Sequence, residues 1–524
     1  MKKIFVIEYL GTPAFEKRID QTIFPYAGNP TPAVDLIRRL ANPPLSCVTA
    51  VFEFSYVDKD YQDEFAAYYA KAFKGYPARC VRIHFFATHV PPHTRFKLHK
   101  YAAAYRGYLI IRPTDLQRLG RTLLPPTITD ADRQFVHCVA PFKAHILGQI
   151  FHIEGMPFMQ QDTQVGACAQ ASLWMIARYF SARFGLREYL PSQINNLAKA
   201  GLAMGRPLPA DRGLTAWQML DALQGMGIEA TGYNIDQNDN VSTHIDTAFP
   251  VEPLQPDNAN LADYRRQFER RRSAKLADIA YRYIESGLPV IFQTHNHAFV
   301  GIGHTYDPEI NAIVAIQRIP AFIVHNDAEG PYLELPLFGS SSSALSFPEV
   351  IGLIAVLPRE VTLRGEEAET RARTVIGELV KPKREDGSVN PFYSAIEASR
   401  PDLVPLLGKL EFRTYLVASA HFQASITQDI VNKRFGPALG YRLLVLDYPR
   451  YVWITEVSSS DLLNKPNRSD RRCIGRVIVD STAPAHTRGE MVVHFCDLAL
   501  FIGRNDGAQK ISHFPNSSPF THRS

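Results

Sequence analysis

Residues 158–183 read FMQQDTQVGACAQASLWMIARYFSAR, and this stretch decides the fold that we predict. Cys168 directly follows the small-residue turn Val165-Gly166-Ala167, and apolar residues then recur at helical spacing as far as Phe180. Because no Pro or Gly interrupts them, we expect a buried helix of about three to four turns that begins at Cys168. The positive end of a helix dipole favours a thiolate and lowers its pKa, so Cys168 is a candidate nucleophile, although Cys is also a common core residue.

The composition is that of a soluble globular protein with several domains. The chain has 524 residues, of which 46% are hydrophobic and 21% are charged, and its formal charge is only +5. The one dense basic run, Arg265 to Arg272, contains Glu269, which favours a solvated helix face and not a nucleic-acid partner. Glu8 interrupts the first apolar run too early for a signal peptide, and no stretch is long enough to span a membrane.

The cysteines and the absence of common motifs exclude several classes of site. Six cysteines lie far apart without a Cys-x-x-Cys pair, which argues against a zinc ribbon or a disulfide framework and for a reducing compartment, the cytoplasm. The sequence has no His-Glu-x-x-His, no Gly-x-x-x-x-Gly-Lys-Ser/Thr, and no Gly-x-Gly-x-x-Gly after a strand. We therefore expect neither a metal nor a cofactor.

Hydrophobic periodicity predicts an α+β protein in three parts. Residues 1–150 form an N-terminal α+β extension, 151–358 a central core, and 359–524 a C-terminal α+β domain. Thr215 is expected to cap one helix, and Gly287 to end another over Lys275–Ser286. Further expectations are a long loop over 235–262 and strands over 313–319 and 441–446.

The second chemical element is a pair of strands. Residues 288–293 form an apolar strand, Thr294-His295-Asn296 turns the chain, and His297 opens a second strand that runs to His304. His295 and His304 compete with His297 as the functional imidazole. Farther on, Asn326-Asp327 ends a strand at a turn.

A cysteine hydrolase requires a thiolate, a His that holds its proton, a polar group that fixes the His tautomer, and donors for the developing oxyanion. Cys168 and its own N–H can supply the first and one of the donors. Gln160, Gln161 and Gln164 are candidates for the other donor, and Gln161 fits best because the loop after it has room to fold back.

The order of these groups is that of the papain-like fold, and the chain resembles one branch of it, the bacteriocin-leader-processing (double-glycine) peptidases. The family's Cys helix, Cys-x-x-Ala-x-Leu-x-Met, corresponds to Cys168-Ala169-Gln170-Ala171-Ser172-Leu173-Trp174-Met175. Its Gly-x-Pro-Val-Ile strand corresponds to Gly287–Ile291, and its His-x-x-x-x-x-Gly strand to His297–Gly303. The resemblance covers about residues 156–358.

This resemblance implies a helix bearing Cys168 packed on an antiparallel sheet that bears His297 and a third catalytic residue. Asp307 lies too close to His297 along the chain, so we assign the third role to Asp327, with Asn326 as second choice. The chain departs from the family at Ala169, where Gly is usual.

Two classes of function follow. The first is a thiol hydrolase that cleaves a peptide or isopeptide bond with Cys168, His297, Asp327 and Gln161, or a transglutaminase-like acyl transferase that uses the same residues. The second is a non-catalytic papain-like scaffold that binds a protein partner. The expected partner is thus a protein or peptide, and the sequence predicts no oligomeric state.

Overall fold

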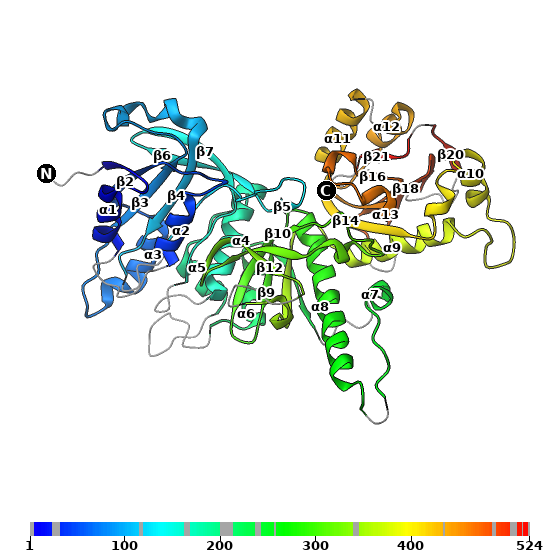
Figure 1. Cartoon of the computed structure of the whole chain (residues 1–524), viewed down its shortest axis with the longest axis horizontal. Helices are drawn as coiled ribbons and strands as arrows, with labels where there is room; N and C mark the ends of the chain where they lie inside the picture. The colour runs from blue at the N-terminus through cyan, green and yellow to red at the C-terminus, as the bar shows by residue number, and fades with distance from the viewer. Residues whose placement is uncertain are drawn as a thin grey trace.

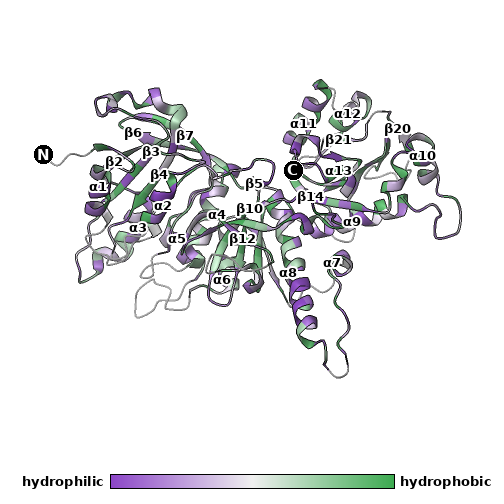
Figure 2. Ribbon diagram, in the orientation of Figure 1, coloured by the Kyte–Doolittle hydropathy of each residue, from purple (hydrophilic) through white to green (hydrophobic). Residues whose placement is uncertain are grey.

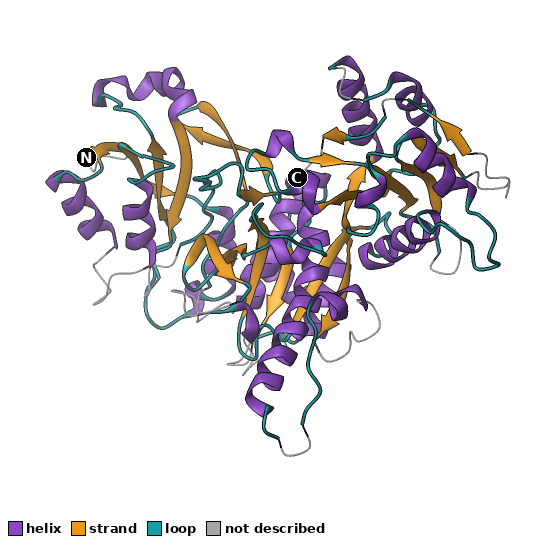
Figure 3. Cartoon of the chain, turned by 45° about the vertical axis from the view of Figure 1, so that its right-hand side comes forward, coloured by secondary structure: helices purple, strands orange, loops and turns teal. Residues whose placement is uncertain are grey.

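The computed structural model describes residues 5–23, 32–114, 119–161, 168–199, 213–235, 243–255, 258–338, 345–432, 435–484, 489–502, 511–515 and 517–521. The fold is α+β, and its three larger sheets are antiparallel. They belong to three lobes that follow one another in chain order, from blue through green to red (Figure 1). Figure 3 shows the strands of the three sheets with helices packed around them.

The N-terminal lobe contains a four-stranded sheet of order β1-β2-β3-β4. One face packs on α1 and α2, and the other packs on a separate hairpin, β6-β7. The strands are β1 (Phe5–Tyr9), β2 (Thr49–Tyr56), β3 (Cys80–Phe86), β4 (Tyr105–Ile111), β6 (Ala140–Ile146) and β7 (Gln149–Gly155). The helices are α1 (Pro13–Ile23), α2 (Pro32–Leu40), α3 (Lys59–Ala67) and the 3₁₀ helices η1 (Tyr69–Lys71) and η2 (Pro92–Ala104).

The core lobe contains a seven-stranded sheet of order β12-β11-β10-β9-β13-β8, with β5 paired to β10. The strands are β5 (Gln134–Val136), β8 (Ile228–Asn234), β9 (Val290–Gln293), β10 (Ala298–Thr305), β11 (Ala321–Asn326), β12 (Gly330–Pro336) and β13 (Gly352–Pro358). The helices are α4 (Cys168–Phe184), α5 (Pro191–Leu197), α6 (Ala216–Gly225), α7 (Thr243–Ala248), α8 (Leu261–Glu285), η3 (Ala315–Arg318) and η4 (Phe347–Glu349). Both α4 and α8 pack on β10, the strand that follows His297.

The C-terminal lobe contains a six-stranded sheet of order β14-β15-β17-β18-β19-β20 and a small β16-β21 pair. The strands are β14 (Leu410–Ala418), β15 (Tyr451–Ser459), β16 (Arg472–Cys473), β17 (Gly475–Asp480), β18 (Glu490–Phe495), β19 (Leu498–Phe501), β20 (Ile511–His513) and β21 (Phe520–Thr521). The helices are α9 (Gly365–Leu379), α10 (Pro391–Ser399), α11 (Ser419–Val431), α12 (Pro437–Leu444), α13 (Ser460–Leu463), η5 (Val404–Leu406) and η6 (Arg468–Asp470).

Two helix ends in the core lobe follow the predicted caps. Thr215 accepts a hydrogen bond from the N–H of Gln218 at 3.3 Å and forms a capping box with it at the start of α6. Gly287 follows α8 with a φ of +68°, the left-handed conformation that ends many helices. Both predictions are confirmed.

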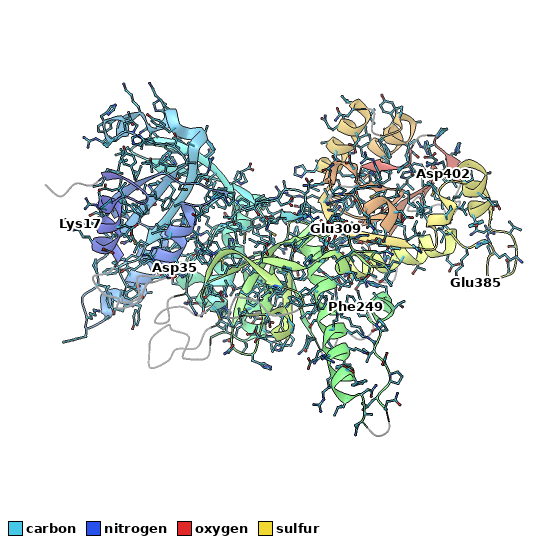
Figure 4. All side chains as sticks on the ribbon, viewed as in Figure 1. Lys17, Asp35, Phe249, Glu309, Glu385 and Asp402 are labelled. Atoms are coloured by element: carbon cyan, nitrogen blue, oxygen red, sulfur yellow. The ribbon has the colours of Figure 1, made fainter. Side chains whose placement is uncertain are left out.

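The prediction of a loop over 235–262 is wrong in part. Within its described residues, Thr243–Ala248 forms α7, and α8 begins at Leu261 instead of Lys275. The first half of α8 projects from the lobe and carries many hydrophilic residues, so it has no apolar stripe that periodicity could detect (Figure 2). Phe249 follows α7, and its carbonyl accepts a hydrogen bond from Arg271 of α8 at 2.8 Å (Figure 4).

Two predicted strands are also wrong. Residues 313–319 contain the 3₁₀ helix η3, because the Gln317 side chain accepts the backbone N–H of Ile313 at 2.8 Å and closes a turn. Residues 441–446 overlap α12, which begins at Pro437 and buries Leu439 and Leu443 one helical turn apart.

The N-terminal lobe is joined to α4 by buried ion pairs. Asp60 accepts a hydrogen bond from Arg178 of α4 through Oδ1 at 2.5 Å and one from Arg121 through Oδ2 at 2.5 Å. The side chains of Asp60 and Arg178 are only 2% and 3% exposed. The helix that begins at Cys168 is therefore fixed against two lobes at once.

None of the helices in the described ranges combines the length and the apolar character needed to cross a lipid bilayer.

Candidate active site

Cys168 is the first residue of α4, as the sequence predicts, and it contacts the first residue of β10. The backbone N–H of Ala298 donates a hydrogen bond to the Cys168 sulfur at 3.3 Å. Four residues along the helix, the Ser172 hydroxyl donates to the carbonyl of Ala298 at 3.3 Å. Both backbone polar groups of Ala298, the residue that follows His297, are thus bound by α4.

His297 lies in the turn between β9 and β10, and its ring is fixed by the turn between β11 and β12. The Nε2 atom is 2.9 Å from Oδ1 of Asn326 and 3.4 Å from Oδ1 of Asp327. The ring also stacks on Phe299, with centroids 5.9 Å apart. The structure thus places both candidates for the third residue at the His297 ring, with Asn326 at the shorter distance, and it joins Cys168 to the backbone of the residue after His297.

The orientation of the Asn326 amide determines the tautomer of His297. The Nδ2 atom of Asn326 donates to Glu329 at 3.0 Å, and its Oδ1 accepts the N–H of Ala328 at 3.1 Å. Oδ1 therefore faces His297, so Nε2 of the imidazole must donate to it. In the neutral ring the lone pair then resides on Nδ1, where it can accept a proton.

Burial opposes charge on both members of the candidate dyad. Burial raises the pKa of the Cys168 thiol, and the charge of Asp327 raises it further, whereas the N–H groups of Ala298, Ala169 and Cys168 lower it. This direction differs from the lowered pKa that the helix N-terminus predicts, because desolvation and Asp327 outweigh the backbone donors. Burial also lowers the pKa of His297, against the hydrogen bond to Asn326. At neutral pH, both directions favour the neutral thiol and the neutral imidazole.

The three candidate glutamines have different surroundings. Gln160 is buried, and its Oε1 accepts the backbone N–H of Leu119 at 2.9 Å, which fixes it to the N-terminal lobe. Gln161 is half-buried in the loop before α4. Gln164 lies outside the described residues. Gln161 stays the predicted second oxyanion donor.

His295 and His304, the two other candidate imidazoles, lie in environments that differ from that of His297. His295 is exposed in the β9-β10 turn. His304 is buried, and its Nε2 lies 2.7 Å from Oε1 of Glu285 on α8 while its Nδ1 lies 2.9 Å from the carbonyl of Thr305. His304 is thus a bonded core residue, and His297 is the imidazole beside Asn326.

All six cysteines are free thiols, and Cys168 alone among them is not fully buried. Burial raises the pKa of Cys47 to about 12. Accessibility therefore distinguishes Cys168 from the cysteines of the lobe cores.

Sequence reasoning did not identify Ser172 or the backbone N–H and carbonyl of Ala298 as parts of the site. A single hydroxyl among apolar helix positions, one turn after Cys168, is the signal that could have found Ser172. Ala298 takes part through its backbone N–H and carbonyl, which nearly every residue type has, so the sequence gives no signal for it.

No protein-family model matches the sequence, and no curated protein matches it either. The resemblance to the papain-like peptidases therefore rests on the residues of the sequence.

Proposed function

We propose that the protein is a papain-like thiol hydrolase that cleaves a peptide or isopeptide bond. The observation that carries the proposal is a hydrogen bond from the N–H of Ala298 to the Cys168 sulfur at 3.3 Å. Ala298 directly follows His297 in the chain, so this bond joins the Cys helix to the strand that begins after His297. A Cys-bearing helix packed on an antiparallel sheet that carries His297 and Asn326 supports a papain-like core.

In the proposed reaction, Nδ1 of His297 takes the thiol proton as Sγ of Cys168 attacks the carbonyl carbon. The oxyanion is held by the N–H of Cys168 and the side-chain amide of Gln161. His297 then gives its proton to the leaving amine, and a thioester stays on Cys168. A water molecule attacks the thioester, loses a proton to His297, and releases the acid product, after which the thiolate recovers that proton.

Asn326 holds the His297 ring throughout, because its hydrogen bond to Nε2 keeps the lone pair on Nδ1. The Asp327 carboxylate, 3.4 Å from the same nitrogen, stabilises the imidazolium that forms during the attack. If an amine replaces water in the second half of the reaction, the same residues perform acyl transfer.

The second candidate is a non-catalytic scaffold, which the pKa directions of Cys168 and His297 favour. Two neutral groups form a less reactive dyad than a thiolate–imidazolium pair. Under either function, the N- and C-terminal lobes are suited to recognising a protein or peptide. The six free thiols suit a reducing compartment such as the cytoplasm.

An acyloxymethyl ketone probe tests the proposal, because its reaction requires both an attacking thiol and a proton-transferring imidazole. Labelling of the full chain should disappear in Cys168→Ala and fall strongly in His297→Ala. His295→Ala is the matched control, since this exposed imidazole lies two residues from His297. Labelling that is equal in all four proteins would exclude catalysis and favour the scaffold.

A further inference from the structure

A cavity of about 390 Å³ lies between the core lobe and the C-terminal lobe. It is formed by the last turns of α4 and α8, by β14, and by the first turn of α11. Its volume falls in the range of small-molecule sites. Cys168 and His297 do not line it, so this interlobe cavity is separate from the candidate active site.

The charged groups deep in the cavity already satisfy one another. Arg413 donates through Nε to Glu285 at 3.0 Å and through Nη1 to Glu456 at 3.0 Å. Glu285 also contacts Nε2 of His304 at 2.7 Å. The carboxylates of Glu285 and Glu456 therefore already have partners in Arg413 and His304 and do not need a ligand.

Two further guanidinium groups at the cavity are not paired with a carboxylate. Arg183, in the last turn of α4, and Arg468, in η6, both line the cavity and are exposed. Neither side chain forms a hydrogen bond or an ion pair with another residue in the described part of the chain. The cavity thus has an excess of positive charge next to apolar side chains, among them Phe184, Leu288 and Phe422.

A metal ion is the competing occupant, because ligand atoms of His137, Glu285 and His304 lie within 4.8 Å of one another. Both nitrogens of His304 face oxygens that only accept hydrogen bonds, the carbonyl of Thr305 and the Glu285 carboxylate. Both nitrogens of the His304 ring therefore already have hydrogen-bond partners, and a metal would have to displace them. The Arg413 guanidinium on Glu285 further repels a cation.

We propose that the interlobe cavity binds a small organic anion, whose phosphate or carboxylate group pairs with Arg183 and Arg468 and whose apolar body packs on Phe184, Leu288 and Phe422. Guanidinium groups match both kinds of oxyanion with paired hydrogen bonds. Partial desolvation and the positive charges of Arg413 and Arg471 lower the pKa of Arg468, while Glu285 and Asp132 raise it, and a bound anion would raise it further.

Calorimetric titration of the full chain with phenyl phosphate tests this site, with benzoate, inorganic phosphate and phenol for comparison. We expect one equivalent of phenyl phosphate or benzoate to bind, with the tighter of the two identifying the anionic group. Inorganic phosphate should bind more weakly, and phenol should not bind. Because charged hydrogen bonds are lost, Arg183→Gln and Arg468→Gln should each weaken binding about tenfold or more.

Arg265→Gln is the matched control, since Arg265 is an exposed arginine on α8 outside the cavity. Unchanged melting temperatures without ligand will show that the variants fold. Cys168→Ala should bind as the wild type does, so failure of this proposal and failure of the proposed hydrolase are distinguishable. Absence of binding by all four probes, or equal binding by wild type and both cavity variants, would overturn the proposal.

Discussion

The His297 imidazole donates from Nε2 to Oδ1 of Asn326 over 2.9 Å, and Glu329 holds that amide in place from its other side at 3.0 Å. This arrangement leaves the lone pair of the neutral ring on Nδ1. In the proposed hydrolase, the ability of His297 to act as a base therefore depends on the Asn326 side chain.

Replacing Asn326 by Ala should slow acyloxymethyl ketone labelling about tenfold or more, because the ring loses its tautomer and its orientation. The labelling rate constant is the measurement, and Asn296→Ala, an exposed Asn in the neighbouring turn, is the control. If Asn326→Ala labels normally while Asp327→Asn does not, the orienting role belongs to Asp327.

The accessibility of the six thiols predicts how many of them react rapidly in the native protein. A disulfide reagent such as Ellman's should modify one cysteine rapidly in the native protein and all six after denaturation, because only Cys168 is not fully buried. In Cys168→Ala the rapid phase should disappear. Several rapid thiols would show that the lobe cores open readily.

The raised pKa of Cys168 predicts the pH dependence of its alkylation by iodoacetamide. Only the thiolate reacts, and a pKa above the ordinary value means that its fraction keeps rising through pH 8, by about tenfold per unit. The rate constant for wild type, with Cys168→Ala as the blank, should therefore show no plateau near neutral pH. A plateau below pH 7 would instead indicate a thiolate–imidazolium pair.

Ser172→Ala should weaken the attachment of α4 to β10. The variant leaves the carbonyl of Ala298 without its hydroxyl donor at a buried position, which should cost about 1–3 kcal/mol of unfolding free energy. Denaturant unfolding measures the loss, and the probe-labelling rate should fall as well because the thiol is less firmly placed. Ser181→Ala, on the same helix but half-buried, should change neither.

Buried His325 should make the fold sensitive to acid. Burial lowers the pKa of His325 to about 3, whereas an unfolded His titrates near 6.5. Between these values the unfolded chain binds the proton and the folded chain does not, so stability falls as the pH drops from about 6.5 toward 3.

His325→Phe removes this titration and keeps an aromatic ring against Phe158 and Tyr332. The loss of melting temperature between pH 7 and pH 4 should therefore be smaller in the variant than in wild type. Equal losses would show that other buried groups dominate the acid response.

The ion pair between Asp60 and Arg178 predicts a large stability effect. Asp60→Asn removes the buried carboxylate that Arg178 shares with Arg121 and leaves Arg178 with only the exposed Glu188, 2.5 Å from its Nη1, as an anionic partner. The variant should therefore cost about 3–5 kcal/mol in denaturant unfolding. Asp20→Asn, an exposed carboxylate in the same lobe, is the control and should change stability little. A loss as small as that of the control would mean that water reaches Arg178.

The parts of the fold that the sequence predicts are those with strong local signals. The helix at Cys168 has an uninterrupted apolar pattern, and Thr215 and Gly287 mark helix ends by side-chain and backbone chemistry that acts within a few residues. The strand over 441–446 fails because short apolar runs suit a helix or a strand equally, and packing of Leu439 and Leu443 decides between them.

In the candidate site, too, some features are predicted by the sequence and others depend on the folded structure. Residue types and their order along the chain predict Cys168 and His297 as candidates. The choice between Asn326 and Asp327 depends on which of the two side chains faces the imidazole. The pKa of Cys168 depends on how deeply the thiol is buried. Neither property can be obtained from the order of residues, because each depends on the three-dimensional structure.

The pairing of β5 with the far half of β10 has a practical consequence. Val136, Phe135 and Gln134 pair with Gly303, His304 and Thr305, beyond the point where β9 ends. A fragment beginning at residue 151 would leave this half of a central strand as an open edge that invites aggregation, and would strip Arg178 of Asp60. We therefore expect a fragment made for study of the candidate site to need residues 134–136 and Asp60 of the N-terminal lobe in addition to residues 151–358.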